Sequence, residues 1–422
     1  MKRFTLILTI VAATSGIVHA DPAPLLGGTW RAWLDSPGGD LPFGLQLTQD
    51  SSAWKAAILN GAERIEIPIV QRQGDELTLA MPHYDSVIKA KSNPDGTRLD
   101  GEWKKRSKGD RVVKMAFHAT SDSTERFVPG PDSDEKCRYA ERLAGRWSIG
   151  FASDEDRSVG VFEAASDGTL VGTILTTTGD YRYLAGTGCS FPAGSGVSLH
   201  LLLSTFDGAH AFLFSAVTDA DAKTLQGDFW SGDTHHDTWI GGRDPDAQLP
   251  DAFTLTKAME SAKLDQVVFP DLQGQKRSLA DPAFSGKARV IEIFGTWCPN
   301  CNDASKYLGE LQTKYKDRGL SILGLAFEYS GDTQRDTEQV QAFVKHHKLD
   351  YPILLAGTSD REKASASLPI IDKLRAYPTL LVLDRNNKIQ ATYTGFSGPA
   401  TGEEYQRFKT KFEALIEKLL AD

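Results

Sequence analysis

The sequence lacks the features of a membrane-spanning or nucleic-acid-binding protein. After residue 20, no stretch approaches the roughly 18 apolar residues of a transmembrane helix. No run of lysines and arginines stands out, and the 422-residue chain has a formal net charge of −9. Nucleic acid and anionic membrane surfaces are therefore not expected partners. Neither a glycine-rich phosphate-binding loop nor a Ser/His/Asp triad can be recognised.

Apolar residues are concentrated at the start of the chain. Lys2 and Arg3 precede the almost wholly apolar stretch Phe4 to Val18, and Val18-His19-Ala20 places small residues at positions −3 and −1 of a cleavage site. These are the three parts of a secretory signal peptide. We expect residues 1–20 to be cleaved, leaving a soluble, periplasmic or otherwise exported protein with no stable membrane insertion. An uncleaved anchor is the alternative, but the apolar stretch is short for a bilayer.

Cysteine is scarce, with only four residues in the chain. Cys137 and Cys189 are far apart, and in an exported protein they are candidates for a structural disulfide, although sequence alone does not fix connectivity. A zinc site would need further ligands at short spacing, so we expect no metal. His235-His236 is interpreted as a solvated turn, and His346-His347 as the end of a helix whose dipole favours cations.

Two segments, residues 21–125 and 137–246, consist of short apolar-polar runs separated by turn residues. Arg64 to Gln71 is one such run, and Asn93-Pro94-Asp95-Gly96 is one such turn. Runs of this length and spacing predict the antiparallel strands of a sandwich or barrel. We therefore expect an all-β N-terminal region.

The second of these segments repeats the pattern of the first. Leu143 to Trp147 echoes Leu26 to Trp30, and Leu225 to Trp230 echoes Leu99 to Trp103. This loose duplication indicates either two small β domains or one larger β structure built from two halves. A Gly-x-Trp opening also occurs in ligand-binding barrels of the lipocalin and avidin type. Plain core packing is its commoner cause, and an analogy of fold does not establish function.

Strand and helix patterns alternate in residues 257–422. Arg289 to Phe294 and Leu320 to Phe327 predict buried strands, and Asn302 to Tyr315 carries apolar residues at helical spacing. Thr379 to Thr394 predicts a hairpin. Alternating strands and helices favour an α/β sheet covered by helices, so the chain is expected to be multidomain.

The motif Trp297-Cys298-Pro299-Asn300-Cys301 lies between a predicted strand and a predicted helix. Two intervening residues bring both sulfurs within bonding distance in one helical turn. Cys298 is expected at the helix N-terminus, where unpaired N–H groups and the helix dipole stabilise a thiolate. Cys301 is then placed to attack a mixed disulfide. A purely structural bridge would close a tiny loop and add little stability, so the motif predicts a redox-active pair.

The segment from about residue 264 to 422 resembles the TlpA/ResA-like family of exported disulfide reductases with a thioredoxin-like fold. The resemblance rests on Phe294-Gly295-Thr296-Trp297-Cys298 and on Tyr377-Pro378-Thr379 before the final strand. The gap between Cys301 and Pro378 also accommodates the strand and helix that this family inserts. The resemblance implies that Cys298 attacks the substrate, that Cys301 resolves the mixed disulfide, and that Pro378 is cis and presents backbone to an extended substrate.

The resemblance assigns roles to three further residues. Glu292, six residues before Cys298, matches a buried acid beneath the pair, and burial would raise its pKa so that it exchanges a proton with Cys301. Trp297 is expected to pack beside the sulfurs, and Tyr377 to shape the substrate site.

The expected function is that of an exported thiol-disulfide oxidoreductase that reduces protein disulfides. It should need no cofactor beyond the Cys298–Cys301 pair, and a membrane electron donor of the DsbD/CcdA type would regenerate the dithiol. Pro299-Asn300 and Tyr377 depart from the commoner residues of the family at positions that tune redox potential, which leaves a disulfide oxidase or isomerase as an alternative. Another alternative is a protein whose β region binds a ligand or partner and whose redox pair is accessory.

Overall fold

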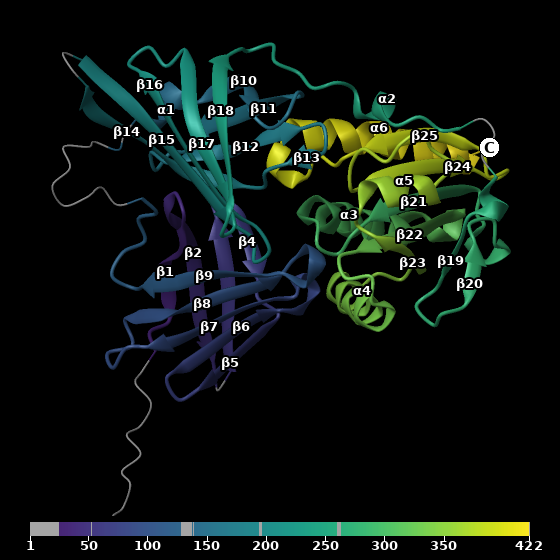
Figure 1. Cartoon of the computed structure of the whole chain (residues 1–422), viewed down its shortest axis with the longest axis horizontal. Helices are drawn as coiled ribbons and strands as arrows, with labels where there is room; N and C mark the ends of the chain where they lie inside the picture. The colour runs from purple at the N-terminus through teal and green to yellow at the C-terminus, as the bar shows by residue number, and fades with distance from the viewer. Residues whose placement is uncertain are drawn as a thin grey trace, which may run out of the picture.

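The computed structural model describes residues 25–51, 53–127, 137, 139–193, 196–259 and 263–421, without the side chains of residues 110, 192, 193, 196 and 197. The expected signal peptide, residues 1–20, lies outside this range. Figure 1 shows two β-sheets from the first half of the chain on one side and an α/β domain from the second half on the other. Within the described residues, no helix combines the length and the apolar character needed to cross a membrane.

The first sheet has nine antiparallel strands in the order β4-β3-β2-β1-β9-β8-β7-β6-β5. Alternate residues of its strands face the core, as Leu41, Phe43, Leu45 and Leu47 do in β2. Its strands are β1 Gly28–Ser36, β2 Gly39–Asp50, β3 Ala53–Asn60, β4 Glu63–Glu66, β5 Ile69–Gln73, β6 Glu76–Met81, β7 Ser86–Ser92, β8 Arg98–Arg106 and β9 Val112–Thr120. The sheet lies within the expected segment 21–125.

The prediction of one strand over Arg64 to Gln71 is wrong. The chain breaks at Ile67-Pro68, so that β4 and β5 lie at opposite edges of the sheet. Proline has no N–H to donate to a ladder, which explains why the strand ends there. The Ile67 N–H instead donates to the Ala56 carbonyl at 2.9 Å.

The second sheet closes into a barrel, because β11 pairs with both β10 and β12. Its strands are β10 Gly145–Phe151, β11 Arg157–Ala164, β12 Leu170–Thr176, β13 Gly179–Asp180, β14 Leu184–Ala193, β15 Gly196–Phe206, β16 Ala211–Asp219, β17 Thr224–Ser231 and β18 His235–Arg243. Trp147, Phe162, Phe214, Phe229 and Trp239 are buried in one hydrophobic cluster of this barrel. The Gly-x-Trp opening thus contributes Trp147 to core packing.

The duplicated sequence pattern has a structural counterpart. The Trp30 indole donates to the Leu26 carbonyl at 3.2 Å, and the Trp147 indole donates to the Leu143 carbonyl at 3.1 Å. Both tryptophans therefore anchor the start of their sheet in the same way. The two sheets also share apolar contacts, since the Phe206 ring of the barrel packs against Phe43 of the first sheet, with ring centroids 4.6 Å apart. The expected all-β N-terminal region is confirmed.

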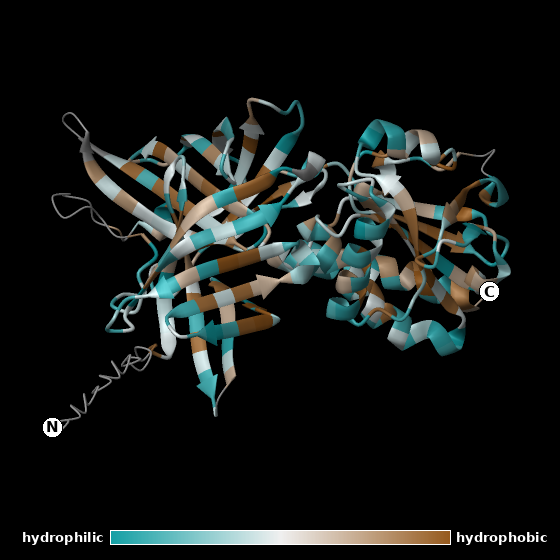
Figure 2. Ribbon diagram, turned by 60° about the horizontal axis from the view of Figure 1, so that its bottom comes forward, coloured by the Kyte–Doolittle hydropathy of each residue, from teal (hydrophilic) through white to brown (hydrophobic). Residues whose placement is uncertain are grey.

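The α/β domain is built on a five-stranded sheet in the order β23-β22-β21-β24-β25, in which β21, β22 and β23 are parallel. Every residue of β21 is buried, which agrees with its continuous apolar run. Figure 2 shows hydrophobic residues concentrated on the strands of this sheet. Its main elements are β21 Ala288–Phe294, α3 Pro299–Tyr315, β22 Leu320–Glu328, α4 Thr333–His347, β23 Ile353–Thr358, α5 Arg361–Ser367, β24 Thr379–Asp384, β25 Ile389–Thr394 and α6 Glu403–Ala421.

Two parts of this domain have no clear sequence signal. The hairpin of β19 (Val268–Pro270) and β20 (Lys276–Ser278) has three-residue strands, too short for an alternating pattern to register. Helix α5 has only seven residues, and Ala364 is its one buried residue. A helix this short presents no repeating apolar stripe.

Candidate active site

Cys298 lies at the start of α3, directly after the loop that follows β21. It is the N-cap residue of the helix, and its Sγ accepts a hydrogen bond from the Cys301 N–H at 3.3 Å. The Sγ atom also lies 3.4 Å from the Tyr377 carbonyl, to which the thiol can donate. The first amides of a helix have no intrahelical partner and favour negative charge. The helix therefore stabilises a thiolate on Cys298.

The two cysteines differ in burial. Cys298 is 5% exposed, whereas Cys301 is completely buried, and neither is in a disulfide here. Burial raises the pKa of the Cys301 thiol well above its usual value, and a hydrogen bond and the charge of Cys298 raise it further. The Cys301 thiol is therefore harder to ionise than an ordinary cysteine. Cys298, less buried and at the start of the helix, is the sulfur better placed to attack a substrate.

Glu292 occupies the middle of β21 and is completely buried. Its carboxyl accepts hydrogen bonds from the Ser305 hydroxyl at 2.8 Å and the Tyr351 hydroxyl at 3.2 Å. Burial raises its pKa to about 8, although both hydrogen bonds oppose the rise. A charge on Glu292 raises the pKa of the Cys301 thiol, so the two groups interact electrostatically.

The residues expected to shape the substrate site lie together. The Tyr377–Pro378 peptide bond is cis, and the Pro378 carbonyl accepts from the Gly395 N–H at 2.9 Å. The Trp297 indole donates to the Phe327 carbonyl at 2.8 Å, and its ring contacts that of Tyr377 edge-on at 5.4 Å. Trp297 thereby packs against the loop whose carbonyl faces Cys298.

A second buried glutamate, missed by sequence reasoning, holds the turn before Cys298. Glu328 ends β22, and its carboxyl accepts from the Thr296 N–H at 2.9 Å and the Thr296 hydroxyl at 2.7 Å. Burial raises its pKa to about 7. The only sequence signal is an acidic residue at the end of an apolar run, and that signal does not reveal its partner.

Helix α4 supports the start of α3 through His347, whose Nε2 lies 2.8 Å from the Asn302 side-chain oxygen. The Asn302 amide in turn donates to the Cys298 carbonyl at 2.9 Å. Burial, with smaller contributions from nearby positive charges, lowers the pKa of His347 to about 3. Helix α4 ends at His347, as expected, but the lowered pKa disfavours the cation, and the partly buried imidazole contacts Asn302 instead.

The remaining candidates lie outside this cluster. Cys137 and Cys189 form a disulfide in the β-rich region. The pair His235-His236 begins β18 rather than forming a turn, and His236 contacts Asp228 at 2.8 Å. Within the residues that the structure describes, no group of three or more His, Cys, Asp or Glu side chains is arranged to hold a metal.

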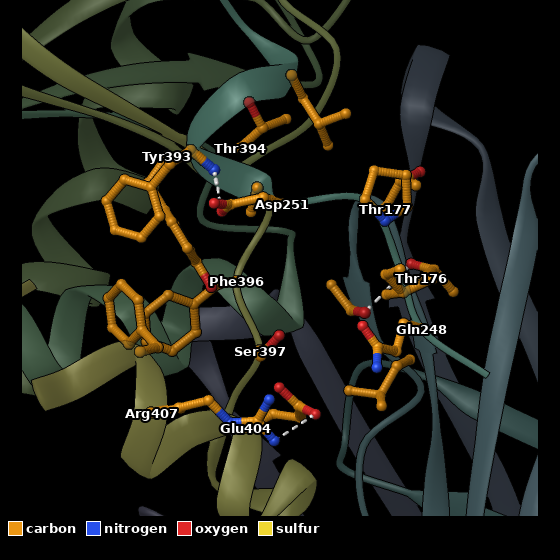
Figure 3. A pocket seen from close by; sticks show the side chains of 18 of the residues that line it. Thr176, Thr177, Gln248, Asp251, Tyr393, Thr394, Phe396, Ser397, Glu404 and Arg407 are labelled. Carbon is orange, nitrogen blue, oxygen red and sulfur yellow. Dashed lines mark hydrogen bonds and ion pairs between the residues drawn. The ribbon is translucent and has the colours of Figure 1, made fainter. Parts of the chain in front are cut away.

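A cleft of about 470 Å³ lies between the barrel and the α/β domain. Figure 3 shows Thr176 and Thr177 on the barrel side, facing Phe396, Ser397 and Arg407 of the α/β domain. Its lining contains neither cysteine of the redox motif. The cleft therefore marks one margin of the contact between the two parts of the chain and is separate from the cysteine pair.

Comparison with known proteins identifies the family to which the α/β domain belongs. A family model described as Redoxin matches residues 241–406. Thiol-disulfide oxidoreductase ResA of Bacillus thuringiensis subsp. konkukian (strain 97-27) is 30% identical over 154 residues, which are 36% of this chain and 80% of ResA. This chain belongs to the TlpA/ResA-like family of thiol-disulfide oxidoreductases. The thioredoxin-like fold and the enzyme class expected for the C-terminal domain are thereby confirmed.

Other similar proteins match comparable shares of the chain. Thioredoxin-like protein YneN of Bacillus subtilis (strain 168) is 29% identical over 124 residues, 29% of this chain and 65% of YneN. The crystal structure of a DsbF homologue from Corynebacterium diphtheriae is 20% identical, with a TM-score of 0.29, and covers 41% of this chain and 96% of its own. The Redoxin match begins at residue 241, so most of the β-rich region precedes it.

Proposed function

We propose that this chain reduces disulfide bonds in exported proteins, with Cys298 as the attacking and Cys301 as the resolving cysteine. The observation that carries the proposal is the asymmetry of the pair. The Cys298 sulfur receives an N–H at the start of α3, while Cys301 lies behind it, completely buried, with a raised pKa. Such an arrangement suits a first attack by one sulfur and a later attack by the other.

The reaction transfers two electrons. The Cys298 thiolate attacks one sulfur of a substrate disulfide, forms a mixed disulfide and releases the other substrate sulfur as a thiolate that takes up a proton. Cys301 then loses its proton and attacks the Cys298 sulfur. The Cys298–Cys301 disulfide forms, and the second substrate thiol leaves. The substrate is reduced by two electrons, and the cysteine pair is oxidised by two.

Glu292 is the proposed acceptor of the Cys301 proton. Its pKa of about 8 lies close to neutral pH, where a carboxyl both takes up and returns a proton readily. Because Ser305 of α3 is hydrogen-bonded to it, the carboxyl is held against the helix that carries Cys301. Trp297, Tyr377 and Pro378 are proposed to line the site where an extended substrate binds.

The redox pair needs no organic cofactor, since the two sulfurs carry the electrons themselves. It does need a donor that restores the dithiol after each turnover. In the compartment implied by the expected signal peptide, we propose a membrane protein of the DsbD/CcdA type as that donor. Protein disulfides are the proposed substrates.

The test is the reduction potential of the Cys298–Cys301 couple, titrated in defined thiol buffers, with Cys301→Ser as the control that cannot form the bridge. A value near the roughly −270 mV of thioredoxin supports a reductase. A value near the roughly −120 mV of DsbA contradicts it and favours an oxidase or isomerase.

A further inference from the structure

The β-rich region lies directly on the redox motif. Gly179 of the barrel faces Asn300, the second residue between the two cysteines, so closely that a Cβ atom at position 179 would overlap the Asn300 amide. Beside it, the Asp180 carboxylate accepts a hydrogen bond from the Gly398 N–H at 2.7 Å. Gly398 belongs to the loop after β25, which also hydrogen-bonds to Pro378 through Gly395. The barrel therefore contacts the two segments of the α/β domain that flank Cys298.

One buried guanidinium connects all three parts of the chain. Arg182, in the barrel, is 4% exposed and forms an ion pair with Asp303, two residues after Cys301 on α3. Its other nitrogens lie 2.9 Å from the carboxylate of Glu63 in the first sheet and 3.7 Å from that of Asp207 in the barrel. Arg182 thus joins the catalytic helix to both β-sheets through charged contacts.

A second contact forms at the other side of the motif, between α4 and the short turn Pro82–Tyr84. The Gln339 amide donates to the His83 carbonyl at 2.8 Å, and Arg335 is ion-paired with Asp85. The rings of His83 and His346 stack with centroids 3.6 Å apart. The β-rich region is therefore held on both α3 and α4, the two helices that position Cys298.

We propose that the β-rich region is a cap on its own redox centre, and that the structure is a closed state from which the cap must lift before a protein disulfide can reach Cys298. The inference rests on the proposed reduction of protein disulfides. Thiol exchange requires the attacking sulfur to meet a substrate sulfur directly. Cys298 is 5% exposed, and the barrel is docked beside it on Asn300 and Gly398, which leaves little room for a folded protein to approach.

The chemistry of the contact suits a cap that opens. Its central interactions are buried ion pairs, and the desolvation cost of burying charges offsets much of their attraction. Polar interfaces between domains resemble those of transient complexes rather than permanent ones. When the cap lifts, Arg182 keeps Glu63 and Asp207 as partners, and of this cluster only Asp303, on the catalytic helix, is left to water.

The test measures how fast Cys298 of the full-length reduced protein is alkylated, by N-ethylmaleimide and by a maleimide carrying a bulky polymer, with the modified residue identified by peptide fragmentation. The wild type is expected to react far more slowly with the bulky reagent than with the small one. Arg182→Met and Asp303→Asn each remove the central ion pair, and both are expected to speed the bulky reaction about tenfold, equivalent to about 1.4 kcal/mol of closed-state stability.

Two variants keep the test decisive. Asp303→Asn keeps the size of the side chain and leaves Arg182 its partners Glu63 and Asp207, so it remains informative if Arg182→Met fails to fold. Arg31→Met is the matched control, because the partners of this buried arginine, Asp40 and Arg126, both lie in the β-rich region. Its alkylation rate should equal that of the wild type. The cap is refuted if the bulky reagent modifies wild-type Cys298 as fast as N-ethylmaleimide does, or if Asp303→Asn leaves the rate unchanged. Failure of the proposed function is distinct, since a protein with a reactive Cys298 would then leave protein disulfides intact.

Discussion

The Ser305 hydroxyl lies 2.8 Å from the Glu292 carboxyl, so the catalytic helix itself supplies one of the hydrogen bonds that this buried acid receives. The second comes from Tyr351. Both hydrogen bonds favour the charged form, yet burial prevails and raises the pKa of Glu292 to about 8. A carboxyl in this state is protonated at neutral pH and can be ionised by a small change in its surroundings.

Replacing Glu292 by Gln should slow the resolving step. At pH 7 we expect release of a mixed-disulfide substrate to fall about a hundredfold, because general base catalysis contributes on that order. In the wild type the rate should rise with pH and level off above about 8, where Glu292 is ionised. Stopped-flow measurement of product release against pH checks both points. Ser305→Ala, which removes a hydrogen bond to the carboxylate, should move the inflection to higher pH, and identical profiles in all three proteins would exclude the role.

The same raised pKa makes stability depend on pH. The folded state keeps the Glu292 proton up to about pH 8, whereas the unfolded chain loses it near 4.5, so the contribution is complete below 4.5 and is lost as pH rises through 8. Denaturant unfolding at pH 5 and pH 9 should show the wild type losing more stability than Glu292→Gln over this range. Glu310→Gln, at an exposed position on α3, is the control and should follow the wild type. Parallel losses in all three proteins would contradict the assignment.

The redox motif could be predicted from the sequence because its determinants are local. A buried strand, a Cys-x-x-Cys motif and an apolar helical stripe follow one another directly, and β21 and α3 lie where these patterns predict. The break at Ile67-Pro68 shows the limit of the same reasoning. The apolar-polar alternation continues on both sides of Pro68. Only the missing backbone N–H of this proline indicates that one strand ends here and that β4 and β5 are separate strands.

The contact between the two halves of the chain could not be predicted. Arg182 and Asp303 are 121 positions apart, and neither belongs to a sequence motif that predicts the other as its partner. The fit of Gly179 against Asn300 depends on backbone geometry, with a positive φ of 148°, which has no periodic signature. Likewise Glu328 and Thr296 meet only because parallel strands place their ends at the same edge of the sheet.

The disulfide between Cys137 and Cys189 should stabilise the barrel without affecting redox chemistry. The bridge spans 52 positions, and loss of a bridge of this kind costs about 2–4 kcal/mol. A double Cys137→Ala, Cys189→Ala variant should therefore unfold at lower denaturant concentration, as followed by tryptophan fluorescence. Its Cys298–Cys301 reduction potential should match that of the wild type. A changed potential would show that the bridge takes part in the redox chemistry.

Lys105 of the β-rich region should assist the reaction of the Cys298 sulfur. The lysine is 6% exposed on β8, and its ammonium donates to the Ala209 carbonyl at 2.9 Å. Burial lowers its pKa to about 8, and the charges of Asp207 and the Cys298 thiolate oppose that shift. Because electrostatic interaction is mutual, a positive Lys105 should also attract negative charge on the Cys298 sulfur.

The rate at which iodoacetamide alkylates Cys298 at pH 7, measured in a Cys301→Ser background, reports this effect. We expect Lys105→Met to slow the reaction several-fold, because a positive charge near the reacting sulfur is lost. Lys105→Arg keeps the charge and should leave the rate unchanged. Lys104→Met is the control, because this neighbour on β8 is ion-paired with Glu102 at the surface. A rate unchanged by Lys105→Met would separate the β-rich region from the chemistry of the cysteine.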